Sequence, residues 1–471
     1  MKIRTFEVPG LAQCSYVVSS GKQAVVIDPV RDIDRYIAYA DENDLSIVAV
    51  TETHIHADFA SGALALARAT RAELALSGYD DREQYRYSMQ HRELHNGDDI
   101  RVGTVRLSVL HTPGHTPEHI SFLLFDLDRS DSIPAMIFTG DFLFVGSLGR
   151  PDLLGDGEKQ RLAKELYRSI TERIANLPDS VQVYPGHGAG SLCGSGMSER
   201  AGSSLGYERA IQPVFHLEQD QFIRTILDSV PPMPAYYPRM KKLNAEGAIS
   251  MEELPRPKAF SPADFQAISP DVTILDLRRP EAFGGAHIPG AINIGAGQNL
   301  SLWAGWLLDP AKSILLVGHS DDLEESRRSL LRVGLDGIVG YLTKGMPAWI
   351  DAGLDFEGIP QLPSTAVQQR DSSTLVLDVR SDGEWRAGHI AGAKHIMLGD
   401  LPGKVGEIPR DRPLVTVCGS GYRSSIAASL LQALNYENLS SMAGGMSAWT
   451  KRGLVTTRAR AHSLEQGPAS Q

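Results

Sequence analysis

The sequence predicts a multidomain α/β protein, and three observations support this prediction. The chain has 471 residues, which is too long for a single domain of typical size. Short apolar strands alternate with helical patterns in its first half. The second half contains two copies of one segment. We therefore expect one large α/β domain followed by two smaller, related α/β domains.

The composition excludes several classes of partner. Charged residues make up 22% and hydrophobic residues 42% of the chain, and the formal net charge is −11. An acidic chain without long basic runs is not expected to bind nucleic acid or an anionic membrane surface. The short basic piece Arg239–Lys242 is predicted to be solvated surface. We find neither a signal-peptide pattern nor an apolar run that could span a bilayer, and we expect a cytoplasmic protein.

The large domain is predicted to cover residues 1–245. Its strands are expected at 15–18, 24–28, 47–51 and 105–110, with helices at 32–43 and 62–70. The strand that ends at Thr51 runs directly into a histidine-rich segment. Loops that follow strands are common places for catalytic groups on a rigid scaffold. A proline-bearing stretch at 230–257 is interpreted as a linker or an ordered extension.

The duplicated segment defines the two smaller domains, at 255–355 and 365–455. One pair of matching segments is Ile274–Arg278 and Leu375–Arg380. A second pair follows them, Gly285–Ala291 and Ala387–Ala393, and its histidines are 102 residues apart. Another segment, which contains glycine, methionine and tryptophan, occurs at 344–349 and again 100 residues later at 444–449. This period is too long for a solenoid repeat, so we infer duplication of a whole domain. The tail at 456–471 is predicted to be flexible.

The segment Thr53–Phe59 carries the strongest functional signal. His54, His56 and Asp58 stand at alternate positions, so a short loop can aim several of them at one centre. Imidazole nitrogen and carboxylate oxygen suit zinc, iron or manganese. Three further segments place a histidine or aspartate after a strand and beside glycine or proline. They contain the following residues: His111 and His115, Asp141, and His187. Four such segments in one domain predict a metal site.

These motifs resemble the metallo-β-lactamase fold, which implies an αββα sandwich for residues 1–245. Phe59 occupies the position where the family motif has a further histidine that helps to hold a second metal. The departure disfavours a dinuclear zinc hydrolase. The segment Gly146–Asp152 resembles the persulfide dioxygenase branch of this fold, which uses one Fe(II). The resemblance implies His54, His115 and Asp141 as its ligands, with open positions for substrate and O₂.

Other polar residues of this domain receive roles from the same resemblance. His56, Asp58 and His187 are expected to orient the ligands and to hydrogen-bond around bound oxygen. The spacing of His56 from His54 also permits direct metal binding. Arg150 either holds an anionic part of the substrate or forms a structural salt bridge. Of the three cysteines, Cys193 lies in a glycine-rich segment that could come near the metal site, and no disulfide framework is expected.

The second copy contains a nucleophile motif. A strand at 414–417 leads to Cys418, and a helical pattern follows the intervening residues. Backbone N–H groups and Arg423 favour an anion there, so we expect a lowered thiol pKa and thiolate attack. A loop with four residues between its cysteine and its arginine resembles the active-site loop of rhodanese, a sulfurtransferase. The resemblance assigns the loop to sulfur binding, through Gly419, Ser420, Gly421, Tyr422 and Arg423. Phosphatases of similar fold use a loop one residue longer.

The first copy lacks this motif. Gly318 and Leu323 stand where the second copy has Cys418 and Arg423, and two acidic residues lie between them. We predict a rhodanese-like domain without catalysis, serving as a spacer, docking surface or oligomerisation element.

The arrangement as a whole resembles bacterial fusions of persulfide dioxygenase with rhodanese. The resemblance implies oxidation of a low-molecular-weight thiol persulfide by O₂ to sulfite at one Fe(II) per chain. It further implies sulfur transfer that forms or uses thiosulfate, and a homodimer or homotetramer. Two alternatives stay open, a zinc-dependent thioester hydrolase of glyoxalase II type and a non-catalytic protein that binds or senses sulfane sulfur.

Overall fold

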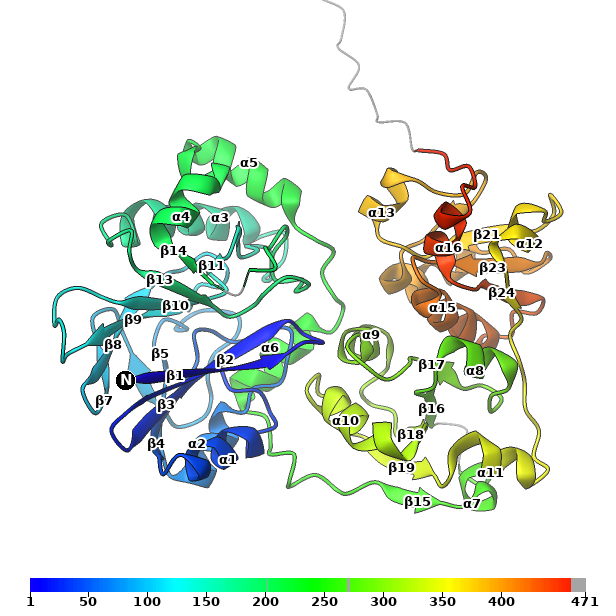
Figure 1. The fold of residues 1–471 in the computed structure, drawn as a ribbon, viewed down its shortest axis with the longest axis horizontal. Coiled ribbons are helices and arrows are strands. Elements are labelled where there is room, and N and C mark those ends of the chain that lie inside the picture. Colours follow the sequence, from blue (N-terminus) through cyan, green and yellow to red (C-terminus); the bar gives the residue numbers. More distant parts are fainter. Residues whose placement is uncertain (201, 269–271, 459–471) are drawn as a thin grey trace, which may run out of the picture. The chain divides into compact units, whose positions relative to one another are not determined.

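The computed structural model describes residues 1–200, 202–268 and 272–458, and these form two compact units (Figure 1). Unit 1 comprises Met1–Pro255 together with Ala304–Trp306 and Arg327–Asp336, and unit 2 comprises the remaining residues. None of the helices in the described residues is long and apolar enough to cross a membrane.

Unit 1 is built on two six-stranded sheets. The first has the order β1-β2-β3-β4-β5-β6 and consists of β1 (Lys2–Val8), β2 (Gln13–Ser20), β3 (Gln23–Ile27), β4 (Ser46–Thr51), β5 (Glu73–Ser77) and β6 (Arg92–Leu94). The second has the order β14-β13-β10-β9-β8-β7 and consists of β7 (Asp99–Val102), β8 (Val105–His111), β9 (Ile120–Asp126), β10 (Met136–Gly140), β13 (Gln182–Pro185) and β14 (Ser203–Ser204). A small hairpin adds β11 (Leu143–Phe144) and β12 (Ser147–Leu148).

Apolar side chains from both sheets form one shared core. Val18 and Ile27 of the first sheet belong to the same buried cluster as Leu107 and Phe122 of the second. Along β8 buried and partly exposed residues alternate, whereas β2, β3 and β9 are buried along nearly their whole length, so one face of each sheet lies in this core. The two sheets therefore pack face to face.

Helices cover the outer faces of the sheets (Figure 1). They are α1 (Asp34–Glu42), α2 (Ala63–Thr70), α3 (Lys159–Arg168), α4 (Leu205–Ile211), α5 (Gln219–Ser229) and α6 (Tyr237–Glu246), with a π turn at Ser169–Arg173 and a 3-10 turn at Pro213–His216. Buried Leu66 in α2 lies over the first sheet, which α2 contacts at β4. Leu166 of α3 and Phe222 of α5 pack in one cluster with Ile137 of β10 in the second sheet. The result is the expected αββα layering.

Helix α6 lies inside the proline-bearing stretch and corrects one prediction. The basic piece Arg239–Lys242 is not solvated surface throughout, because Met240 is fully buried and Lys241 is only 1% exposed. The amphipathic pattern of α6 turns these two side chains inward while Lys242 faces solvent. The stretch is thus an ordered extension of unit 1 at this point.

Unit 2 contains two parallel sheets of identical strand order. The first, β15-β19-β18-β16-β17, consists of β15 (Lys258–Phe260), β16 (Thr273–Asp276), β17 (Ile292–Asn293), β18 (Ile314–Val317) and β19 (Ile338–Leu342). The second, β20-β24-β23-β21-β22, consists of β20 (Gln361–Leu362), β21 (Leu375–Asp378), β22 (Lys394–His395), β23 (Leu414–Val417) and β24 (Leu439–Met442). Corresponding strands occupy corresponding places, as a duplicated domain requires.

Helices connect the strands in each copy. Those of the first copy are α7 (Pro262–Gln266), α8 (Pro280–Gly285), α9 (Leu300–Leu307), α10 (Ser320–Leu331) and α11 (Gly345–Asp351). Those of the second are α12 (Ser364–Gln368), α13 (Asp382–Ala387), α14 (Leu401–Lys404), α15 (Tyr422–Ala433) and α16 (Gly445–Lys451), with 3-10 turns at Leu398–Asp400 and Val405–Glu407. Helix α15 of the second copy contacts β17 of the first (Figure 1).

The repeated histidines have a structural role in both copies. His287 stacks on Phe283 with 3.8 Å between ring centroids, and His389 stacks on Trp385 at 3.5 Å. Each histidine also forms an isolated backbone bridge, His287 to Glu357 and His389 to Thr457. The ring stacking explains why both copies have a histidine at this place, whereas the backbone bridges do not depend on the side chain. The bridge to Thr457 also orders the start of the predicted flexible tail, and residues 459–471 lie outside the described part of the chain.

Candidate functional site

The metal-site residues of unit 1 come from loops that follow strands. His54 stands three residues beyond the end of β4, and Asp141 directly follows β10. His115 lies in the turn between β8 and β9, and His187 lies two residues beyond β13. Glycine at position 186 is required, because a Cβ there would lie only 2.6 Å from Oδ1 of Asp141.

Three of these side chains form a metal-binding arrangement. The ligand atoms of His54, His115 and Asp141 all lie within 4.8 Å of one another, and the three residues are buried. Oδ2 of Asp141 lies 3.9 Å from Nε2 of His54 and 3.5 Å from Nε2 of His115. None of these three atoms has a hydrogen-bond partner among the described residues. Buried polar atoms rarely stay unsatisfied, so a cation fits between them.

Hydrogen bonds elsewhere on the rings aim the free atoms at this centre. Nδ1 of His115 donates to the carbonyl of Arg150 over 2.9 Å, which leaves the lone pair on Nε2. Nδ1 of His54 lies 2.9 Å from Oγ1 of Thr53. Burial holds the pKa of both histidines well below the ordinary value. Both rings are therefore neutral, as metal ligands must be.

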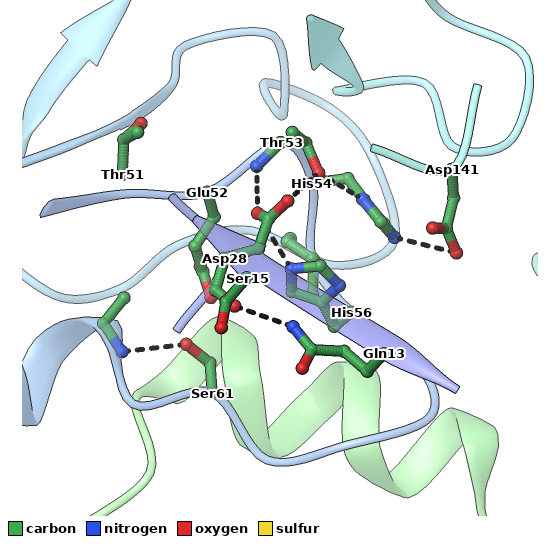
Figure 2. Close-up of polar contacts among 12 residues, drawn as sticks. Gln13, Ser15, Asp28, Thr51, Glu52, Thr53, His54, His56, Ser61 and Asp141 are labelled. Atoms are coloured by element: carbon green, nitrogen blue, oxygen red, sulfur yellow. Dashed lines mark hydrogen bonds and ion pairs between the residues drawn. The ribbon is translucent and has the colours of Figure 1, made fainter. Parts of the chain in front are cut away.

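Asp28 organises the start of the histidine loop (Figure 2). Its carboxylate accepts hydrogen bonds from the backbone N–H of Thr53 at 2.6 Å and from Oγ1 of Thr53 at 3.0 Å. Nε2 of His56 lies 3.1 Å from the same carboxylate. Although burial lowers the pKa of His56, the charge and hydrogen bond of Asp28 outweigh burial and raise it. His56 thus pairs with Asp28, and it does not belong to the three-ligand cluster.

Asp28 was not singled out from the sequence. The available signal was an acidic residue at the end of the buried apolar strand β3. Asp28 also has a left-handed backbone, with φ of +53°. Such a conformation is uncommon for residues with a side chain, aspartate adopts it more readily than most, and such residues cluster at functional sites.

His187 lies between the two carboxylates Asp58 and Asp141. Its Nε2 is 2.8 Å from Oδ2 of Asp58, and its Nδ1 is 2.7 Å from Oδ1 of Asp141. Burial lowers the pKa of His187, but the two carboxylates outweigh it and raise the pKa well above the ordinary value. These two contacts hold the ring of His187 and thereby fix the orientation of Asp141.

Cys193 completes a second group of possible metal donors with Asp58 and His187. Their ligand atoms also lie within 4.8 Å of one another. Both nitrogens of His187 are already engaged by carboxylates, and the ring of Phe59 is fully buried beside it. Burial raises the pKa of the Cys193 thiol well above its usual value, with Asp58 and Asp141 adding to the effect. This group therefore disfavours a second metal ion.

Lys241 and Glu118 hold both backbone groups of Ile55, between the two histidines of the motif. Nζ of Lys241 donates to the carbonyl of Ile55 over 2.8 Å, and the N–H of Ile55 donates to Glu118 over 3.0 Å. Asn244 of the same helix donates to the carbonyls of His56 and Phe59. None of these three side chains was identified from the sequence, because each acts across at least 63 residues.

Two further histidines of this domain, His111 and His119, differ in position. His119 is fully buried, and its Nε2 accepts a hydrogen bond from the backbone N–H of Asp141 at 3.2 Å. It therefore positions the ligand Asp141. His111 ends β8, where it stacks on Tyr79 at 3.6 Å and contacts the carbonyl of Pro117.

The structure does not support substrate binding by Arg150. Its guanidinium forms a two-pronged ion pair with Asp152, at 2.7 and 2.9 Å, and donates to the carbonyl of Leu192. Only 2% of the residue is exposed. These contacts match the structural salt bridge of the alternative interpretation, and they brace the segment in which the Arg150 carbonyl orients His115.

The second candidate centre is the loop of Cys418 in unit 2. The side chain is fully buried at the end of β23, and the N–H of Gly421 points at its sulfur over 3.1 Å. Behind the loop, Met446 donates its N–H to the carbonyl of Cys418 over 2.7 Å. A Cβ at Gly445 would lie 2.3 Å from this carbonyl, which explains the glycine before Met446. The loop is thus preorganised for an anion at sulfur.

The predicted anion-binding Arg423 has a partner that was not foreseen. Its guanidinium pairs with both carboxylate oxygens of Glu384, each at 2.7 Å. Although burial raises the pKa of Glu384, the Arg423 contact outweighs it and lowers the pKa to about 2. Glu384 therefore stays ionised and fixes the direction of Arg423 beside the loop.

The loop of the first copy has no nucleophile, as predicted from its sequence. Gly318 follows β18 where Cys418 follows β23, and the acidic residues Asp321 and Asp322 lie in the first turn of α10. Contacts also join this copy to the Cys418 loop. The hydroxyl of Tyr422 donates to the carbonyl of Gly295 over 2.8 Å.

Comparison with protein families matches the two parts of the chain separately. The metallo-beta-lactamase superfamily model matches residues 8–187. The rhodanese-like domain model matches residues 261–352 and 363–452. The predicted fold, a metallo-β-lactamase domain followed by tandem rhodanese domains, is therefore confirmed.

Individual relatives refine this assignment. The mitochondrial persulfide dioxygenase ETHE1 of Mus musculus is 32% identical over 220 residues, which cover 45% of this chain and 76% of the relative. A hydroxyacylglutathione hydrolase of Polaromonas sp. is 36% identical over 166 residues, covering 35% of this chain and 57% of that relative.

A solved structure extends the similarity beyond unit 1. The crystal structure of a metallo-beta-lactamase from Staphylococcus aureus subsp. aureus COL has a TM-score of 0.66 and 38% sequence identity to this chain. The match covers 73% of this chain and 98% of that one. Together with the buried His-His-Asp cluster and the cysteine loop, these similarities show that the chain belongs to the metallo-β-lactamase superfamily, as a homologue of persulfide dioxygenases fused to two rhodanese-like domains.

Proposed function

We propose that the chain oxidises a low-molecular-weight thiol persulfide with O₂, giving the thiol and sulfite. In balanced form, RSSH, O₂ and H₂O yield RSH, sulfite and two protons. The reaction takes place in unit 1 at one Fe(II) held by His54, His115 and Asp141. We further propose that Cys418 in unit 2 transfers sulfane sulfur, so that the chain forms or uses thiosulfate.

The observation that carries the proposal is the set of three unpaired donor atoms in a buried site. They are Nε2 of His54, Nε2 of His115 and Oδ2 of Asp141. Two imidazoles and one carboxylate are the ligand set typical of non-haem Fe(II) oxygenases. When bound, iron supplies open coordination positions for O₂ and a sulfur donor. The neighbouring position, where a second metal ion would bind, is closed by Phe59 and by His187, which is paired to two carboxylates.

The surrounding residues prepare this site in specific ways. His119 and His187 hold Asp141 through its N–H and Oδ1, so that Oδ2 stays free. Lys241 and Glu118 hold the backbone between His54 and His56. Because these groups are buried and paired, the ligands need little reorganisation when metal binds.

In unit 2 the proposed step is thiolate chemistry at Cys418. The thiolate attacks the outer sulfur of thiosulfate, the S–S bond breaks, and sulfite leaves while Cys418 becomes a persulfide. The reverse reaction uses sulfite from unit 1 and yields thiosulfate. The N–H of Gly421 favours the charged sulfur through its hydrogen bond.

The dioxygenase activity is tested by anaerobic reconstitution with Fe(II), followed by O₂-electrode measurements with glutathione persulfide. We expect O₂ uptake and an equal amount of sulfite from the wild-type protein, and neither above the apo-protein background from Asp141→Ala. Reconstituted wild-type protein without O₂ uptake would reject the proposal.

The assignment of the two reactions to separate units is tested with Cys418→Ser. Serine is a far weaker nucleophile, so thiosulfate:cyanide sulfurtransfer should fall by at least about 10³-fold. Oxygen uptake should persist, because the metal ligands belong to unit 1. Loss of both activities in a folded variant would contradict the assignment of the two reactions to separate units.

A second candidate function is hydrolysis of a thioester such as a hydroxyacylglutathione. The identity to hydroxyacylglutathione hydrolases supports it. Metal analysis discriminates the two, because two zinc ions per chain with thioester cleavage favour the hydrolase. One iron per chain and no thioesterase activity favour the dioxygenase.

A further inference from the structure

We propose that the first rhodanese-like copy is a binding site for the anionic carrier thiol whose sulfur the enzyme handles. The copy has lost its nucleophile but keeps a cleft of about 1040 Å³ at the former active-site loop. Gly318, His319 and Leu323 of that loop line the cleft. A volume of this size accommodates a tripeptide or a nucleotide-bearing small molecule. The inference rests on the proposed function and names a further site for its substrate class.

Lys344 provides an independent sign that the cleft has a function. It lines the cleft, and its backbone is left-handed with φ of +59°. The corresponding residue of the catalytic copy is Gly444, with φ of +69°. Lysine is unfavourable in this conformation, whereas glycine adopts it freely. A lysine held in this conformation among the residues that line the cleft indicates that its ammonium group serves the cleft.

The charges of the cleft indicate an anionic ligand with an apolar part. Arg279 and Lys344 line the cleft and are exposed, and neither side chain has an ion-pair partner within the described residues. Arg278 also lines it but is neutralised by Asp276 at 2.6 Å. Asp322 also lines the cleft and contributes one negative charge. Two free cations can bind carboxylates or phosphates, and Asp322 can bind an ammonium group.

Aromatic and aliphatic side chains form much of the remaining wall. Tyr341, Leu277 and Met346 belong to it, together with Tyr422 from the catalytic copy. Glutathione and coenzyme A both combine methylene groups, which can pack against such a wall, with carboxylate or phosphate groups. The cleft fits this class better than it fits thiosulfate alone, which has no apolar body.

Tyr422 connects the cleft to the catalytic cysteine. It follows Gly421, whose N–H contacts the sulfur of Cys418 at 3.1 Å, and it is the first residue of α15. Its hydroxyl is held by the carbonyl of Gly295, another residue of the cleft wall. A ligand in the cleft therefore lies against the same residue that begins the catalytic helix. This explains why an inactive copy is placed next to an active one.

The experiment is hydrogen–deuterium exchange by mass spectrometry on the full-length Cys418→Ser protein, which prevents sulfur chemistry. The probes are S-methylglutathione, which carries carboxylates, and S-methyl-coenzyme A, which carries phosphates; both lack a free thiol. We expect at least one probe to slow exchange about twofold or more in the cleft segments, at 277–282, 295–297, 318–323 and 341–347. The probe that does so identifies the anionic group.

Two variants locate the effect. Lys344→Gly introduces the glycine that the catalytic copy has at this left-handed position, and Arg279→Gln changes an exposed side chain. Both variants should therefore fold. Each should weaken probe binding roughly three- to tenfold, as loss of one charge-assisted contact predicts. Lys312→Gly, an exposed lysine outside the cleft, is the matched control and should bind as the parent does.

Two outcomes overturn the proposal. One is the absence of protection in the cleft segments of the parent protein with both probes at 10 mM, a level roughly ten times the upper end of ordinary substrate affinities. The other is protection that neither Lys344→Gly nor Arg279→Gln reduces. Failure of the proposed function itself is seen separately, as absence of O₂ uptake by the iron-loaded wild-type protein.

Discussion

Lys241 donates a hydrogen bond of 2.8 Å from its ammonium group to the carbonyl oxygen of Ile55. Its Nζ also lies 3.6 Å from Glu118, which accepts the N–H of the same Ile55. An ion pair buried in unit 1 thus holds the peptide groups on both sides of one residue of the metal-binding loop. This arrangement leads to the first prediction.

Replacement of Lys241 by methionine should destabilise unit 1 by about 3–5 kcal/mol, because it leaves Glu118 buried and without its cation. Urea denaturation at neutral pH measures the change. Lys242→Met is the matched control: its side chain is 71% exposed, and it should change the free energy of unfolding by no more than about 0.5 kcal/mol. Equal stabilities of the two variants would show that the buried pair is not needed.

Metal content should separate the ligands from the neighbouring histidine. Alanine at His54, His115 or Asp141 removes one of three donors, and bound iron after reconstitution and desalting should fall about tenfold or more. His56→Ala should retain iron near the wild-type level at saturating metal, because His56 pairs with Asp28. Mass-spectrometric metal analysis of the four variants checks this. Loss of iron from His56→Ala, with retention in His115→Ala, would refute the ligand assignment.

Asn293 of the first copy should act as a positioning residue for α15, the helix that follows the Cys418 loop. Its Oδ1 accepts from Ser425 of α15 at 2.6 Å, and its side-chain amide donates to the carbonyls of Asp276 and Arg278. Asn293→Ala should cost about 2–3 kcal/mol of stability, because buried partners lose their bonds. It should also lower kcat/KM for sulfurtransfer while leaving O₂ uptake unchanged.

The control for this variant is Asn299→Ala, whose side chain is exposed in the same copy. To distinguish positioning from general destabilisation, the pH–rate profile of sulfurtransfer is recorded below the unfolding temperature of each variant. A displaced catalytic loop shifts the profile, whereas a merely less stable fold does not. An unshifted pH–rate profile with unchanged kcat/KM would show that Asn293 does not position the Cys418 loop for sulfurtransfer.

Stability at acid pH should depend on Glu384. Its pKa is lowered to about 2 in the folded chain from an ordinary value of 4.5. A carboxyl with a depressed folded-state pKa stabilises the fold above its unfolded pKa, and this contribution is lost as the pH falls from 4.5 toward 2. Because 37% of the side chain is exposed, we expect about 1 kcal/mol at neutral pH, well below the full value of the shift.

The measurement compares urea unfolding of wild type and Glu384→Gln at pH 7 and at pH 4. The variant should be less stable at pH 7, and the difference between the two proteins should shrink at pH 4. Asp382→Asn, a change of an exposed carboxylate on the same helix, should show no such convergence. A difference that grows as the pH falls would contradict the sign of the pKa shift.

Much of the site could be predicted from the sequence because its chemistry is encoded locally. His54 stands next to Thr53 and shortly after a strand, and Cys418 begins a loop whose glycines and Arg423 lie within six residues. The domain duplication is visible directly as a repeat. Side-chain type and short spacing decide these features, so they can be read without knowing the fold.

Other features depend on which distant segments pack together. Lys241 looked like part of a solvated basic run, and only the packing of α6 turns it toward Ile55, 186 positions away. Arg423 looked free to bind substrate, and only the fold places Glu384 against it. Tyr422 looked like a loop residue of one domain, and only the contact of the two copies brings it to Gly295.

The sequence by itself therefore determined the kinds of chemistry that this protein can hold: a buried site of two imidazoles and one carboxylate, and a cysteine loop shaped for an anion. The tertiary structure decided which atoms stay free to perform that chemistry. The physical reason is that a polar group's availability depends on its hydrogen-bond and ion-pair partners, and here those partners come from segments tens to hundreds of residues away.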